Sequence, residues 1–196
     1  MKQLEELNIK QLSRNKLIGL YSNILSLDPG PLKRPYVALL MEVIGRGLEA
    51  ASEVDAGIQH EVRNLPDGFT FDMRAVPDGP SFAMEKCGAS GLRYLGSSAP
   101  HPPDVSLKFK HVEHAFLVMS FQEGTAQAFA NDRLLLDGEI AYAMKLVRCL
   151  NRMESLILPK FIAVRALKRY PKLPVLEKLV GGGKIYLRLA KNLVWK

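Results

Sequence analysis

Two histidines, His111 and His114, lie three residues apart in the motif HVEH. On a helix this spacing places both rings on one face, where they could bind a metal ion. The HExxH motif of zinc hydrolases is absent, however, and no third ligand follows at a suitable spacing. We interpret the two histidines as a surface pair, so the sequence predicts no metal site.

The glycine run GGGK at residues 181–184 could suggest a phosphate-binding loop. Ile185 stands where such a loop needs Ser or Thr, and the earlier glycine of the motif is missing. We interpret the run as a flexible hinge between two C-terminal helices. The nucleophile motif GxSxG is also absent, and spacing alone identifies no acid and base pair. The sequence therefore predicts no catalytic residue, no cofactor and no enzymatic activity.

Length and composition limit the class of protein. A chain of 196 residues, 47% of them hydrophobic, is long enough to form one domain with a buried core. The first residues are polar where a secretory signal would be apolar, and no apolar run reaches the roughly 18 residues that a membrane span needs. Cys87 and Cys149 are far apart, and we interpret both as buried thiols. We therefore predict a protein of the reducing cytoplasm.

Hydrophobic periodicity predicts the elements that would carry a binding site. From about residue 3 to 64 the period is helical, with a break at DPGPLKRP, residues 28–35. From residue 68 apolar and polar residues alternate in GFTFDMRAV, which is typical of a half-buried strand. Four more strands are predicted at SFAMEKC, GLRYLG, DVSLKFK and RLLLDG, and two short helices at HVEHAFLVMSF and GTAQAFAN. An amphipathic helix is predicted to begin near Glu139 and to close the domain.

The order of these segments resembles the sterol carrier protein type-2 family. The similar part runs from about residue 60 to 158 and includes DVSLKFK, AQAFANDRLLLDGE and IAYAMKLVRCL. Within the family, the sequence is most similar to a bacterial lipid-binding branch linked to isoprenoid quinone (ubiquinone) biosynthesis. The resemblance implies an α+β fold, in which helices cover a five-stranded mixed sheet and enclose an apolar tunnel for a lipid chain. It implies binding or transfer of lipid, and it supplies no catalytic residue.

Large apolar side chains of this region are the predicted lining of the tunnel. Methionine is flexible, which suits a pocket that accepts flexible chains. For any one of these residues, simple packing of the core is the alternative. The predicted lipid-binding residues are Phe71, Phe109, Phe116, Leu117, Phe121, Phe129, Leu134, Leu136, Met144, Val147, Leu150 and Met153.

The net charge of +7 is concentrated near the C-terminus, where residues 145–196 hold 13 Lys and Arg against two Asp and Glu. In KIYLRLAKNLVWK a basic line lies beside an apolar line, a pattern typical of a helix in a membrane interface. Packing of this helix on the domain is the alternative. We predict three parts: a helical segment at 1–64 that packs on the core, a lipid-binding domain at 65–158, and a basic amphipathic extension at 159–196. The predicted membrane-docking residues are Lys184, Arg188, Lys191 and Trp195.

Other functions compete with a lipid carrier. Nucleic-acid binding would explain the basic tail, but an RNP motif, a zinc knuckle and a recognition helix are all absent. A scaffold that binds another protein through its apolar faces is the main alternative, and an enzyme that uses the same fold is a third. The partners we predict are a lipid with an acyl, prenyl or sterol-like chain, an anionic membrane surface and lipid-metabolising enzymes.

Overall fold

The computed structural model describes residues 30–157 and 175–194. The chain divides into two compact units, Met1–Leu32 and Lys33–Lys196, and the sheet with its helices belongs to the second. The helix predicted before residue 28, the first of the two predicted C-terminal helices (residues 158–174) and the predicted docking residue Trp195 lie outside the described residues.

Five strands form one mixed sheet, which confirms the predicted sheet. The strands are β1 (Thr70–Ala75), β2 (Ser81–Cys87), β3 (Gly91–Gly96), β4 (Val105–Phe109) and β5 (Leu134–Gly138). Their spatial order is β3-β2-β1-β4-β5, with β1 and β4 parallel and all other neighbours antiparallel. Because side chains alternate along a strand, Phe71 and Met73 of β1 share one face, and Thr70 and Asp72 share the other.

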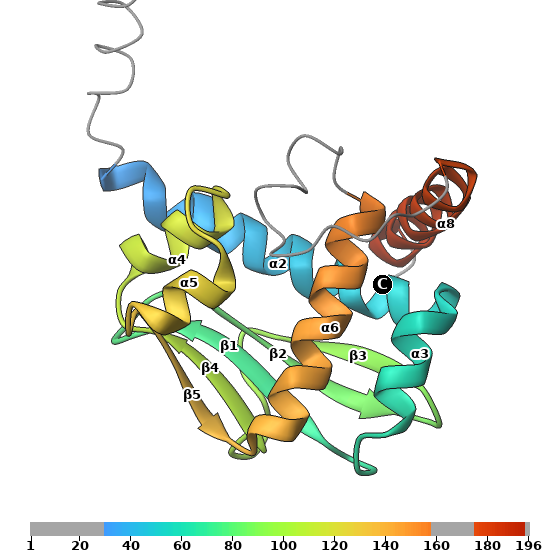
Figure 1. Ribbon diagram of the computed structural model, residues 1–196, viewed down its shortest axis with the longest axis horizontal. Helices are drawn as coiled ribbons and strands as arrows, with labels where there is room; N and C mark the ends of the chain where they lie inside the picture. Colours follow the sequence, from blue (N-terminus) through green and yellow to red (C-terminus); the bar gives the residue numbers. More distant parts are fainter. Residues whose placement is uncertain (1–29, 158–174, 195–196) are drawn as a thin grey trace, which may run out of the picture. The chain divides into compact units, whose positions relative to one another are not determined.

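Helices cover the apolar face of the sheet. They are α2 (Gly30–Val54), α3 (Ala56–Arg63), α4 (Val112–Met119), α5 (Thr125–Ala130) and α6 (Ile140–Ile157), followed by α8 (Val175–Val194). Figure 1 shows α3, α4, α5 and α6 on the same side of the sheet. The core between sheet and helices is built from fully buried residues such as Met41, Leu48, Phe71, Phe82, Phe109 and Leu146. The predicted α+β class is therefore confirmed.

Ion pairs fix α3 along one side of α6. Asp55 caps the start of α3 by accepting the Ile58 backbone N–H at 3.0 Å, and it also pairs with Arg152 of α6 at 3.1 Å. One turn earlier on α6, Arg148 donates to Glu61 of α3 at 2.7 Å. These contacts set the direction in which the remaining sides of α6 point.

Two local predictions are wrong. The break predicted at residues 28–35 is instead helical from Gly30 onward, and α2 contains Pro35. Proline lacks a backbone donor, and close to a helix start few hydrogen bonds are lost with it. Cys87 is exposed because it is the last residue of β2, next to the turn at Gly88, whereas Cys149 is buried as predicted.

Candidate functional site

The predicted apolar residues of the sheet lie on its helix-covered face. Phe71 of β1 and Phe109 of β4 are fully buried, and Leu134 of the edge strand β5 is buried beside Phe109. Leu136, two residues further along β5, is only partly buried. The apolar face of the sheet is therefore less completely covered toward the end of β5.

The α4 and α5 helices and the segment between them carry four of the predicted residues. Phe116 and Leu117 of α4 are half-buried, and Phe116 packs edge-on against Tyr36 of α2 with ring centroids 5.2 Å apart. Phe121 follows α4 and is also half-buried, in the left-handed backbone region at φ 59°. Phe129 of α5 is 51% exposed. These four side chains are therefore only partly buried in the core.

A line of apolar residues runs along α6 and is called the α6 strip: Ile140, Met144 and Val147. Ile140 is 62% and Met144 49% exposed, and Val147 is half-buried. Positions separated by four and three residues share a helix face, and this face is not the one that pairs with α3. In Figure 1, α6 runs between α3 and the α4–α5 pair. The predicted residues Leu150 and Met153, by contrast, are buried in the core.

Glu154 lies seven residues after Val147, on the same side of α6 as the α6 strip. Burial raises the pKa of this carboxyl to about 7. Among the residues that the structure describes, Glu154 has no hydrogen-bond or ion-pair partner. Sequence analysis missed this residue; its only signal is that it is the single acidic residue of α6.

The structure places α8 against α6. Ile185 is fully buried, and a Cβ on Gly182 would lie 2.7 Å from the Leu156 carbonyl oxygen. Arg188 forms an ion pair with Glu53 of α2. The interpretation of Gly181–Gly183 as a hinge is wrong, because these glycines lie inside α8 and bring its backbone close to α6.

The opposite side of α8 is exposed. Lys184 and Lys191 are on this side together with Leu187, which is 75% exposed, and Val180. Arg188 lies one turn after Lys184 and, unlike the two lysines, is engaged in an ion pair, with Glu53. Across the described part of the chain, each helix is too short or too polar to span a bilayer.

The histidines of the HVEH motif lie at the start of α4, with ring centroids 5.8 Å apart. His111 is exposed and precedes the helix, and His114 is half-buried, so that burial lowers the pKa of its imidazole. Within residues 30–157 and 175–194, no three His, Cys, Asp or Glu side chains come together as metal ligands.

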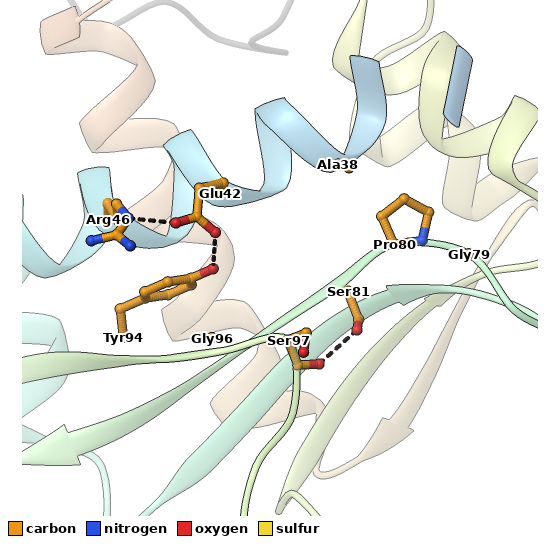
Figure 2. Close-up of a pocket in the computed structure, with 9 residues that line it drawn as sticks. All are labelled: Ala38, Glu42, Arg46, Gly79, Pro80, Ser81, Tyr94, Gly96 and Ser97. Carbon is orange, nitrogen blue, oxygen red and sulfur yellow. Dashed lines mark hydrogen bonds and ion pairs between the residues drawn. The ribbon is translucent and has the colours of Figure 1, made fainter. Parts of the chain in front are cut away.

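A cavity of about 540 Å³ lies between α2 and one end of the β2–β3 hairpin. Figure 2 shows Ala38, Glu42 and Arg46 of α2 on one side of it and the strand residues on the other. Glu42 accepts a hydrogen bond from the Tyr94 hydroxyl and one from Arg46 Nε at 2.5 Å. These bonds lower the pKa of Glu42, while burial, followed by the contact with Glu42, raises the pKa of Tyr94.

Comparison with known proteins gives similarity at the level of structure only. No protein family model matches the chain, and no curated protein matches it. Solved structures similar to it include a UbiJ-SCP2 ubiquinone synthesis protein, with 12% identity, a TM-score of 0.43, and coverage of 63% of this chain and all of that one. Another is sterol carrier protein 2 from Yarrowia lipolytica, with 9% identity, a TM-score of 0.42 and coverage of 59% and 93%. A third is sterol carrier protein domain 2 of Helicoverpa armigera, with 22% identity, a TM-score of 0.38 and coverage of 58% and 84%. These structures bear the name of the family that the sequence resembles.

Proposed function

We propose that this protein binds the apolar chain of a lipid along the α6 strip and the neighbouring apolar residues of α4, α5 and β5. The observation that carries the proposal is the exposure of Ile140 and Met144, together with Phe129 of α5. These large side chains lie at the border of an otherwise buried core. Contact with an apolar ligand would remove their exposed apolar surface from water, which is favourable. The tunnel predicted from the sequence is part of this proposal.

The energetics of such a site are favourable for a flexible chain. Each methylene removed from water contributes about 0.8 kcal/mol, before the cost of ordering the ligand. Glu154, with a pKa raised to about 7, holds its proton more readily than an exposed glutamate. A neutral carboxyl group is less costly beside an apolar chain, and it can donate a hydrogen bond to the polar end of the ligand.

The ligand class and the cellular role follow from the sequence resemblance. We propose an acyl, prenyl or sterol-like chain, and a non-enzymatic role as an accessory factor in isoprenoid quinone biosynthesis that presents the chain to lipid-metabolising enzymes. The exposed side of α8, with Lys184, Leu187 and Lys191, would dock the protein on an anionic membrane. Near such a surface each basic residue contributes about 1 kcal/mol.

Organic extraction of the purified protein followed by mass spectrometry tests this proposal. A carrier is expected to release a stoichiometric lipid with a long apolar chain. A matched pair of variants locates the site: Met144→Glu is expected to lose the lipid, whereas Val43→Glu on α2, at a side chain 45% exposed, is expected to retain it. An extract without lipid, or equal loss in both variants, contradicts the proposal.

A scaffold that binds another protein is the second candidate. Leu39 and Val43 of α2 are 62% and 45% exposed and lie four residues apart on one face of the helix. Such a face fits an apolar surface of a partner protein. If this is the functional surface, Val43→Glu abolishes co-purification of a partner and Met144→Glu does not.

A further inference from the structure

The cavity between α2 and the β2–β3 hairpin shares no residue with the α6 strip, and lipid binding does not explain it. Its volume of about 540 Å³ is in the range of small-molecule sites. On the strand side, the pairing of β2 with β3 shifts between Ala83 and Met84, and bulges of this kind often lie next to functional sites. The residues that line the cavity are Ala38, Glu42, Arg46, Gly79, Pro80, Ser81, Tyr94, Gly96 and Ser97.

A carboxylate and a guanidinium are held side by side at one end of this cavity. A Cβ on Gly45 would lie 2.5 Å from the Tyr94 ring, so glycine is needed for the ring to pack this close to α2. The Tyr94 hydroxyl then donates to one oxygen of Glu42, and Arg46 Nε donates to the other at 2.5 Å. The Arg46 guanidinium also lies over the Tyr94 ring, 5.2 Å from its centroid. Figure 2 shows these three side chains as one group.

Both charged groups of this cluster keep capacity for further hydrogen bonds. Each oxygen of the Glu42 carboxylate accepts one bond and has a further lone pair. Arg46 uses only its Nε–H in hydrogen bonds to the described residues, so both Nη groups remain donors. The lowered pKa of Glu42 keeps its carboxylate ionised at neutral pH. A ligand can therefore meet a full negative charge and a full positive charge within one cavity.

The two opposite charges limit the kind of ion that binds well. A lone anion at the Nη groups of Arg46 would lie beside the Glu42 carboxylate, and a lone cation at Glu42 would lie beside the guanidinium. Each attraction is then opposed by a repulsion from the neighbouring group. A molecule that carries an ammonium and an oxyanion a few bonds apart can place each against its opposite charge, and both contacts are charge-assisted hydrogen bonds.

We propose that this cavity is a second binding site, which takes a small zwitterion and selects it over singly charged ions. Glu42 receives the ammonium, and the Nη groups of Arg46 receive the oxyanion, which is a carboxylate or a phosphate. Ser81 donates to the Ser97 carbonyl oxygen at 2.6 Å, and the oxygens of this pair can accept hydrogen bonds from other polar groups of the ligand. The site is independent of the lipid proposed for the α6 strip.

Amide chemical-shift titration of the full chain tests this inference. The zwitterionic probes are β-alanine and phosphoethanolamine, and the controls are ethylammonium and propionate, each of which lacks one charge of β-alanine. Saturable shifts at Gly79, Ser81, Gly96 and Ser97 are expected with at least one zwitterion, with a Kd about tenfold lower than for either control ion. Binding of only one zwitterion identifies the oxyanion as carboxylate or as phosphate.

Two variants of the charged pair are expected to change the preference in opposite directions, which a folding defect cannot imitate. Glu42→Gln leaves the arginine unopposed and is expected to bind propionate more tightly than ethylammonium. Arg46→Gln leaves the carboxylate unopposed and is expected to bind ethylammonium more tightly than propionate. Both variants are expected to lose the preference for the zwitterion.

The matched control is Glu53→Gln, in the same helix but outside the cavity and paired with Arg188, which is expected to bind as the wild type does. The inference is overturned if neither zwitterion gives saturable shifts at these amides, or if a singly charged ion binds the wild type as tightly as the zwitterions. It is also overturned if Glu42→Gln and Arg46→Gln keep the wild-type preference.

Discussion

Gly182 of α8 lies directly against the backbone carbonyl of Leu156 in α6, where a Cβ would be only 2.7 Å from the oxygen. This close approach, the full burial of Ile185 and the ion pair between Arg188 and Glu53 hold α8 on the domain. The amphipathic pattern that predicted a membrane helix therefore belongs to a helix with two different sides: one side of α8 packs on the domain, and the other is exposed.

Substitution of neighbouring glycines tests this packing. Gly182→Ala is expected to lower the melting temperature by several degrees, because the methyl group forces α8 away from Leu156. Gly183→Ala meets nothing within 4 Å and is expected to stabilise the helix by up to about 1 kcal/mol. Differential scanning calorimetry measures both, and a fall of similar size in the two variants would argue against the close contact.

Membrane docking by the exposed side of α8 predicts unequal roles for its basic residues. The double variant Lys184→Gln, Lys191→Gln is expected to lower the fraction of protein that floats with anionic vesicles several-fold, because both side chains face solvent. Arg188→Gln is expected to change flotation little, since Arg188 already pairs with Glu53. If the Arg188 variant loses as much binding as the double variant, α8 docks in another orientation.

The raised pKa of Glu154 predicts a pH dependence of stability. The carboxyl ionises near 4.5 in the unfolded chain and near 7 in the folded one, so the folded state holds the proton more tightly. Its contribution to stability is complete below about pH 4.5, falls as the pH rises, and is lost above about pH 7. Urea unfolding between pH 4.5 and 8 should show a smaller decline in Glu154→Gln than in the wild type. Glu139, which is exposed and directly precedes α6, provides the control. Glu139→Gln should keep the wild-type decline, and identical curves for all three proteins would be inconsistent with a raised pKa of Glu154.

Local patterns were sufficient to predict the sheet. Alternation in residues such as Phe71 and Met73 reflects a strand with one buried face, and this signal lies within a few consecutive residues. The helix α6 was predicted for the same reason, since its apolar positions recur at helical spacing. The arrangement of these elements, with helices covering a five-stranded mixed sheet, was implied by the resemblance to the sterol carrier protein type-2 family.

Features that depend on residues distant in the sequence could not be predicted from local patterns. The glycines at 181–183 have the same composition whether they form a hinge or a close helix contact, and only the position of Leu156 distinguishes the two. The burial that raises the pKa of Glu154 depends on the three-dimensional packing around α6, and the cavity at Tyr94 depends on a strand bulge and on Gly45, 49 residues earlier. The exposed state of Phe129 and Met144 likewise follows from the placement of whole helices.

The most direct test of lipid binding at the α6 strip is photocrosslinking with a diazirine-bearing fatty acid, followed by mapping of the labelled residues by mass spectrometry. The proposal predicts label on residues 116–153, with Met144 and Phe129 among the modified positions, and loss of that label when excess unlabelled fatty acid is added. Label scattered over the surface, confined to α2 or α8, or insensitive to the competitor would contradict it.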